Sequence, residues 1–206
     1  MALVDARYRF VMVDIGANGR ACDAGVFARS AMAAALEHNT VNIPPPRPLP
    51  GRVNNVPFVI VGDDAFGLKP HIMKPFPGRE SGDFERIHNY RLSRARRVSE
   101  NAFGILAKRF RILDKRMNLS ADKCTTVVNA CIVLHNYLMS RNDRQYANSS
   151  PDPVISLESV SHQGSNRSTD SARNICDEFA DYFITNGQVD WQWDIVQCNM
   201  SNTGTE

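Results

Sequence analysis

The sequence predicts a mixed α/β chain with additional helices toward its C-terminus. An alternating N-terminal segment predicts two antiparallel strands, at residues 2–5 and 10–15, joined by a short turn. The continuous apolar run at 57–62 predicts a buried strand. Two long stretches, 89–113 and 120–139, carry apolar residues at helical spacing.

Between the hairpin and the buried strand, the sequence predicts one helix and one extended loop. The alanine-rich segment 21–37 is expected to be helical, with Asp23 at the N-cap, where a carboxylate accepts bonds from free amides. The proline run 44–50 excludes helix and sheet and predicts a rigid extended spacer. A ligand for a proline-binding groove is the alternative interpretation.

The rest of the chain is organised around the helix expected at 89–113. Glu100 lies off its apolar stripe, with Arg96 and Arg97 one turn before it. The surface beside this carboxylate is therefore cationic on one side, and the local excess of Lys and Arg suits a phosphate partner. A solvated basic helix face is the alternative. The stripe itself comprises Ala95, Val98, Ala102, Leu106, Phe110 and Leu113.

The C-terminal part of the chain predicts two further helices separated by a polar linker. His135, on the apolar face of the 120–139 helix, is expected to be a hydrogen-bonded core histidine and not a metal ligand. Residues 174–185 predict a short helix, and the two tryptophans after it are expected to dock the tail onto the core. The predicted division is 1–140 for the domain, 141–173 for the linker, and 174–206 for the C-terminal helix and tail. The core face of the second helix is expected to comprise Val127, Val128, Cys131, Leu134, His135 and Leu138.

Composition, charge and cysteine spacing limit the classes of protein to which the chain can belong. The 206 residues have a formal net charge of +2, so the distribution of charge says more than its sum. The five cysteines have no metal-ligand spacing, which indicates reduced thiols. Charges near the N-terminus exclude a signal peptide, and no apolar run is long enough to cross a membrane.

Four acidic residues are candidates for chemistry. Asp63 and Asp64 follow the buried strand, where carboxylates at a sheet edge can reach a ligand. Asp64 could instead cap the segment that follows. Asp14, at a strand end, and Asp23, at a helix start, are interpreted as structural.

Five segments resemble the PIF/Harbinger transposases and the host nuclease-like proteins derived from them. They are NYRLSRARRVSENAFGILAKRFRIL at 89–113, VIVGDDAFGLKPHIMKPFPG at 59–78, CIVLHNYLM at 131–139, VDIGANGRACDAGVF at 13–27 and FITNGQVDWQW at 183–193. The resemblance implies an RNase H-like DDE nuclease fold. It places Asp63 and Glu100 at two of the three metal-binding acids, with Asp64 left a capping role. The block with the first catalytic Asp precedes the region of resemblance, so the chain is expected to lack that acid and the first strand.

The resemblance also implies cofactors and partners. A DDE nuclease hydrolyses a phosphodiester with two divalent ions, Mg²⁺ or Mn²⁺, held by hard oxygen ligands. It implies DNA as substrate, a separate Myb-like DNA-binding partner protein, and location in the nucleus, with the cytoplasm as a second compartment. The alternative is a catalytically silent DNA- or protein-binding remnant of a transposase. The side chains expected to contact DNA phosphates are Arg94, Arg96, Arg97, Lys108 and Arg111.

Overall fold

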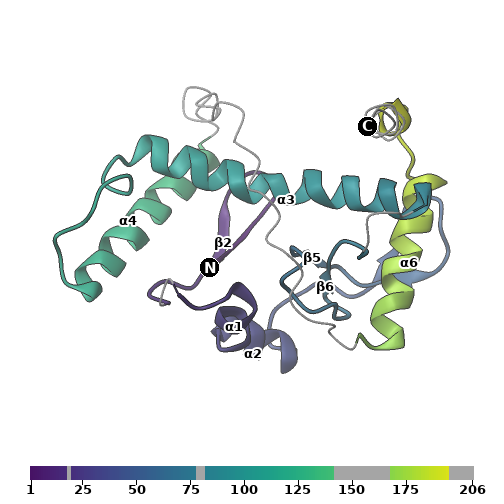
Figure 1. Cartoon of the computed structure of the whole chain (residues 1–206), viewed down its shortest axis with the longest axis horizontal. Helices are drawn as coiled ribbons and strands as arrows, with labels where there is room; N and C mark the ends of the chain where they lie inside the picture. Colours follow the sequence, from purple (N-terminus) through teal and green to yellow (C-terminus); the bar gives the residue numbers. More distant parts are fainter. Residues whose placement is uncertain (18–19, 78–81, 142–167, 195–206) are drawn as a thin grey trace, which may run out of the picture. The chain divides into compact units, whose positions relative to one another are not determined.

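The structure is a computed structural model that describes residues 1–17, 20–77, 82–141 and 168–194 (Figure 1). Its described residues form a mixture of helices and short strands, as the sequence predicts. The predicted linker falls mostly on residues 142–167, which lie outside the described part.

The chain divides into two compact units, each made of two separate stretches. Unit 1 comprises Met1–His38 and Arg96–Ser161, and unit 2 comprises Asn39–Ala95 and His162–Glu206. Helix α3, Asp83–Arg109, contributes its first half to unit 2 and its second half to unit 1.

Unit 1 begins with the predicted hairpin. Strands β1 (Ala2–Val4) and β2 (Phe10–Val13) pair antiparallel. Asp5 organises the turn between them, because its Oδ1 accepts hydrogen bonds from the Arg7 amide at 2.8 Å and the Arg9 amide at 3.0 Å. Two local bonds to one carboxylate explain why the reversal forms within so few residues.

The helix predicted at 21–37 is two helices, α1 (Asp23–Ala28) and α2 (Ala31–Glu37). Ser30 breaks the segment because its side chain competes with the helical ladder: Oγ donates to the Phe27 carbonyl at 2.7 Å and accepts from the Ala33 amide at 3.1 Å. Ser30 thus caps α2. The N-cap of α1 is Cys22, so the expectation that Asp23 holds that position is wrong by one residue.

The second half of α3 builds the core of unit 1. Ala102 and Leu106 are buried there together with Phe10. The helix ends at Arg109, four residues before the predicted end, and the chain turns so that the next helix can fold back. Phe110 and Leu113 lie in that turn and still pack against the same core, which is why they fit the helical stripe in sequence.

Helix α4 (Ala121–Ser140) holds the hairpin through two adjacent side chains. The His135 imidazole is fully buried, and its Nε2 lies 2.7 Å from the Tyr8 carbonyl oxygen. The Asn136 amide bonds both backbone groups of Phe10, accepting from its N–H and donating to its C=O, each at 2.8 Å. The expectation of a hydrogen-bonded core histidine is confirmed.

The buried face of α4 is rotated from the predicted one. Cys131, Ile132 and His135 are buried, whereas Leu134 is 50% exposed. The prediction that Leu134 packs in the core is therefore wrong. Two apolar arcs adjoin on this helix, and helical spacing alone cannot tell which one faces the hairpin.

Unit 2 contains two separate strand pairs. Strands β3 (Arg47–Pro48) and β4 (Asn55–Val56) pair antiparallel, so the proline run does include a strand, contrary to prediction. A two-residue strand has few ladder bonds to lose, which is why it tolerates Pro48. Strands β5 (Ile60–Val61) and β6 (Ile72–Met73) pair in parallel. The predicted buried strand is thus present but short, and its two residues are half-buried.

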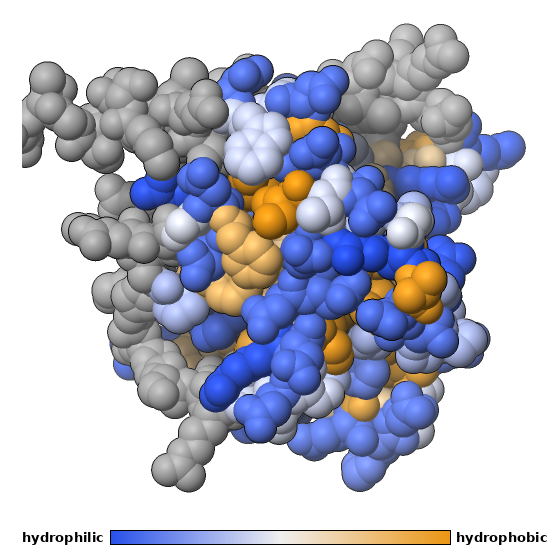
Figure 2. All heavy atoms as spheres, turned by 90° about the vertical axis from the view of Figure 1, so that its right-hand side faces the viewer, coloured by the Kyte–Doolittle hydropathy of each residue, from blue (hydrophilic) through white to orange (hydrophobic). Residues whose placement is uncertain are grey.

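Helix α6 (Asp170–Ile184) packs its inner face onto the rest of unit 2. It starts four residues before the predicted helix because Thr169 caps it, its Oγ1 accepting from the Ala172 amide. Cys176 is buried against Met73 and Leu92. The surface on the α6 side of Figure 1 is mostly hydrophilic, with hydrophobic side chains visible between the charged ones (Figure 2).

His88, on the unit 2 half of α3, sits beside Cys176 in this core. The imidazole is fully buried, with Nε2 3.6 Å from the Cys176 sulfur and the ring 4.7 Å from that of Phe76. Burial lowers the pKa of His88 to about 4, against the opposing effect of a hydrogen bond with Asn89. Burial also raises the pKa of the Cys176 thiol to about 12. Both groups are therefore neutral packing elements at pH 7 and not a reactive pair.

Removing the Asn136 amide should loosen the hairpin of unit 1. Asn136→Ala leaves two partly buried backbone groups of Phe10 without their partner, at a cost of about 2 kcal/mol. Amide hydrogen exchange of residues 8–13, followed by mass spectrometry, should accelerate by roughly 30-fold. Lys123→Ala, at an exposed site on the same helix, is the control and should leave exchange unchanged. Equal exchange in both variants would contradict this role of Asn136.

The stability of unit 2 should fall in mild acid because of His88. The unfolded chain protonates this imidazole below its ordinary pKa of 6.5, whereas the folded chain takes up the proton only near pH 4. Stability is thus fully present above pH 6.5 and is lost as pH falls toward 4, by about 3 kcal/mol. Urea unfolding followed by tryptophan emission reports unit 2, since both tryptophans, Trp191 and Trp193, lie there. In His88→Gln the loss over this pH interval should shrink by that amount, and an unchanged slope would refute the assignment.

Candidate functional site: an acidic residue on a basic helix

Glu100 lies on the unit 1 half of α3, on the side away from the core. Its Oε1 is 3.7 Å from the Arg96 guanidinium, one turn earlier on the helix. The two side chains remain 26% and 38% exposed. An ion pair this open is worth well under about 1 kcal/mol, so it orients the carboxylate without sequestering it.

Further cationic side chains lie on the unit 1 half of α3 and just after its end. Arg97 and Lys108 are exposed and eleven residues apart, which places them on one face of α3. Arg111 is exposed in the turn that follows the helix. These side chains can all reach a polyanion outside unit 1.

Arg94, predicted to contact phosphates, belongs to unit 2 and has a partner there. Its guanidinium lies over the Trp191 ring, 4.2 Å from the ring centroid. Trp191 also meets the Tyr90 ring edge-on, with centroids 5.9 Å apart. The expectation that a tryptophan docks the C-terminal segment is confirmed for Trp191. Gln192 reinforces this docking: it is fully buried, and its Nε2 donates to the Phe183 carbonyl at 2.9 Å.

The two units differ in charge. Among the described residues, unit 1 carries 13 Lys and Arg against 7 Asp and Glu, whereas unit 2 carries 8 against 10. The small net charge of the whole chain hides this difference. The electrostatic attraction for a polyanion is therefore concentrated on unit 1, the unit that contains Glu100.

The two acids after β5 make different contacts. Asp63 caps the following turn, because its Oδ1 accepts from the Ala65 amide at 2.9 Å. Asp64, expected to be the capping residue, has its Oδ1 3.4 Å from the Lys74 ammonium. Asp63 can still offer a ligand its other carboxylate oxygen. Whether Asp63 is a metal ligand stays a prediction.

The predicted pair of ligands is divided between the two units. Asp63 belongs to unit 2 and Glu100 to unit 1. Within the described residues, no three His, Cys, Asp or Glu side chains are grouped closely enough to hold a metal ion. The expectation that the two carboxylates share one ion site therefore stays a prediction.

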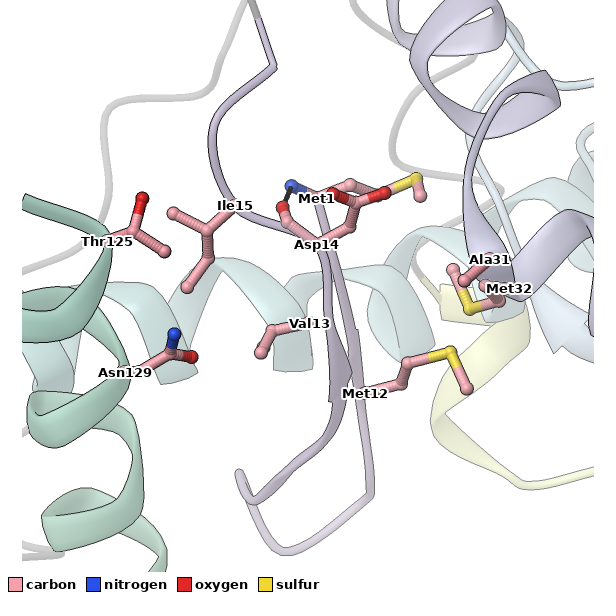
Figure 3. Close-up of a pocket in the computed structure, with 9 residues that line it drawn as sticks. All are labelled: Met1, Met12, Val13, Asp14, Ile15, Ala31, Met32, Thr125 and Asn129. Carbon is pink, nitrogen blue, oxygen red and sulfur yellow. Dashed lines mark hydrogen bonds between the residues drawn. The ribbon is translucent and has the colours of Figure 1, made fainter. Parts of the chain in front are cut away.

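A pocket of about 310 Å³ lies elsewhere in unit 1, between the hairpin, α2 and α4 (Figure 3). Asp14 is on its wall, and the Met1 ammonium donates to the Asp14 carbonyl oxygen at 2.7 Å. Ile15 points from the hairpin toward Thr125 and Asn129 of α4. No local spacing in the sequence indicates this pocket, because its residues come from three distant segments.

Carboxylates that can hold divalent ions are the ligands from which metal-dependent phosphodiester-cleaving sites are built. Residues 1–136 match the family described as DDE superfamily endonuclease, and the chain belongs to this family. Membership implies an RNase H-like fold; no solved structure matches the chain. In the part of the chain that the structure describes, no helix is both long and apolar enough to span a bilayer.

Two curated relatives agree with this family. The chain is 30% identical over 98 residues to a mouse (Mus musculus) protein named "Putative nuclease HARBI1", covering 46% of this chain and 28% of that protein. It is 27% identical over 144 residues to "Protein ALP1-like" of Arabidopsis thaliana, covering 69% of this chain and 35% of that protein. The matched region thus spans about a third or less of these relatives. The resemblance drawn from the sequence motifs is confirmed.

Proposed function

We propose that this chain contributes to a divalent-metal-dependent DNA endonuclease, with Glu100 and Asp63 as carboxylate ligands. The observation that carries the proposal is the setting of Glu100: a partly exposed carboxylate on a basic helix, inside the region that matches the endonuclease family. The proposed substrate is the phosphodiester backbone of DNA. A DNA substrate in turn supports nuclear location and a separate Myb-like DNA-binding partner protein.

The donor chemistry of the two residues fits Mg²⁺ or Mn²⁺, which take hard oxygen ligands. Glu100 is accessible to a cation from solvent, and its pair with Arg96 is weak enough to be replaced. Asp63 engages one oxygen with the Ala65 amide, which fixes the carboxylate and leaves the second oxygen for a ligand. Divalent ions in such a site supply an activated water and stabilise the leaving oxygen.

The basic side chains of unit 1 supply substrate binding. Arg97, Lys108 and Arg111 are exposed, and each can neutralise one phosphate. Contacts of this kind hold a duplex in register without reading its sequence. Arg96 has a second role beside Glu100, since its guanidinium balances the carboxylate until a cation binds.

The chain should bind duplex DNA through phosphates. Affinity should fall steeply with salt, and Arg97→Ala with Lys108→Ala should reduce the slope of log K against log salt by about 2, one for each lost contact. Fluorescence anisotropy on two unrelated duplex sequences measures this and should show little preference between them. Arg173→Ala, which removes an exposed arginine of unit 2, is the control and should leave the slope unchanged. Salt-insensitive binding would count against the proposal.

Metal-dependent nicking tests the two carboxylates. Supercoiled plasmid should be nicked with Mg²⁺ or Mn²⁺ and not with EDTA, and Glu100→Gln or Asp63→Asn should slow nicking by about 100-fold or more. Asp64→Asn is the matched control at the neighbouring acid, and it should keep activity because Asp64 pairs with Lys74. Nicking that survives Glu100→Gln would rule out the assignment. Salt-dependent DNA binding with no cleavage by the parent chain would instead favour the catalytically silent alternative.

A further inference from the structure

Helix α4 exposes an apolar surface that the fold of unit 1 does not use. Beside its buried face, Val133 is 67% exposed, Leu134 50% and Tyr137 54%. With the exposed Ala130, these residues recur at i, i+3, i+4 and i+7, so they form a continuous line along the helix. We call these four residues the outer stripe. An ordered apolar line of this kind on a charged surface marks an interaction site.

Cations bound the outer stripe at both ends. Lys123 is exposed two turns before Ala130, on the same line of the helix. Arg141 follows Tyr137 by one turn, and its guanidinium lies 5.3 Å from the centre of the Tyr137 ring while its Nε donates to the phenol oxygen at 3.1 Å. Among the described residues, the acid nearest to Lys123 in sequence is Asp122, which points about 100° around the helix from it. Along this side of α4, a cationic side chain therefore stands at each end of the outer stripe.

Because of these charges, a second copy of the chain is not the molecule expected to bind the outer stripe. A parallel pair of α4 helices would set Lys123 against Lys123 and Arg141 against Arg141. An antiparallel pair centred on Leu134 would bring Arg141 of one copy within about one turn of Lys123 of the other. Both arrangements place like charges together. The stripe is also only about 10 Å long. A patch of that length is too small to bury the roughly 800 Å² per partner that a stable dimer buries.

DNA does not fit the outer stripe either. Phosphates could pair with Lys123 and Arg141, but the grooved, charged backbone offers nothing to cover Val133, Leu134 and Tyr137. An amphipathic helix does both, because its own apolar residues at i, i+3, i+4 and i+7 can interdigitate with the stripe. The small Ala130 allows the two helix backbones to approach closely.

We propose that the outer stripe of α4 docks an amphipathic helix of a partner protein that carries Asp or Glu at both ends of its apolar face. The apolar contacts supply the affinity, and the terminal ion pairs fix the register. This inference is independent of the nuclease proposal, since it involves neither Glu100 nor Asp63. The small contact area corresponds to a reversible interaction.

The test uses a synthetic helical peptide of about 18 residues, with Leu at i, i+3, i+4 and i+7 and Glu at both ends. Fluorescence anisotropy with the full chain should give saturable binding. Leu134→Asp or Tyr137→Asp should weaken it by about tenfold or more. Both sites are exposed, so the variants should retain the helical circular dichroism of the parent chain. Val53→Asp, at a 90% exposed valine of unit 2, is the matched control and should bind as the parent does.

A charge reversal makes the test specific for the proposed chemistry. Lys123→Glu with Arg141→Glu should weaken binding of the Glu-ended peptide and favour the same peptide ended with Lys. Equal binding of a scrambled peptide, or no binding of the Glu-ended one, would overturn the proposal. Self-association in analytical ultracentrifugation that Leu134→Asp abolishes would assign the stripe to a second copy instead. Displacement of the peptide by duplex DNA, with DNA affinity lowered by Leu134→Asp, would assign it to DNA.

Discussion

Unit 1 depends on the contact between two neighbouring side chains of α4 and the backbone of the N-terminal hairpin. Asn136 bonds both the N–H and the C=O of Phe10, and so takes the place of a third strand at the open edge of β2. The His135 imidazole is in hydrogen-bond contact with the Tyr8 carbonyl oxygen in the turn. Tyr8 has a positive φ of 61°, a conformation that costs energy for a residue with a side chain and that the surroundings must hold in place. The Phe10 ring then packs between these polar contacts and the second half of α3.

This contact also explains why the motif CIVLHNYLM is informative. Its His and Asn are the two residues that bind the hairpin, and its Cys131 and Ile132 close the core beneath them. The same motif contains Val133, Leu134 and Tyr137, which the core does not need. One short segment thus combines an internal role on one side of the helix with an exposed apolar line on the other.

The features that the sequence predicts correctly are those set by local physics. The hairpin, the existence of α3 and α4, and the place of β5 follow from alternation, helical spacing and apolar runs. Errors arise where a distant contact or one polar side chain decides. Ser30 divides a helix that alanine content alone would continue. Leu134 fits the helical pattern of a core position, but which arc of α4 is buried depends on a hairpin more than 120 residues earlier.

The same distinction between local and distant contacts applies to the candidate site. The basic residues near Glu100 lie on the same helix as Glu100. The sequence spacing of Arg96 and Arg97 from Glu100 is therefore enough to predict that they lie near it. The role of Arg94 is not local, because Trp191, which it contacts, comes from the C-terminal end of the described chain. The turn after β5 is decided by single hydrogen bonds, which is why the roles of Asp63 and Asp64 cannot be separated by position alone.

The interleaving of the two units has a consequence for how the chain is made. Phe10 and Asn136 are 126 residues apart, and the whole first stretch of unit 2 is translated between them. Until α4 emerges from the ribosome, the edge of β2 has no amide to close it. At usual rates of synthesis this interval lasts roughly 6 to 25 seconds. During that time the nascent hairpin presents an open strand edge, which other strands can pair with.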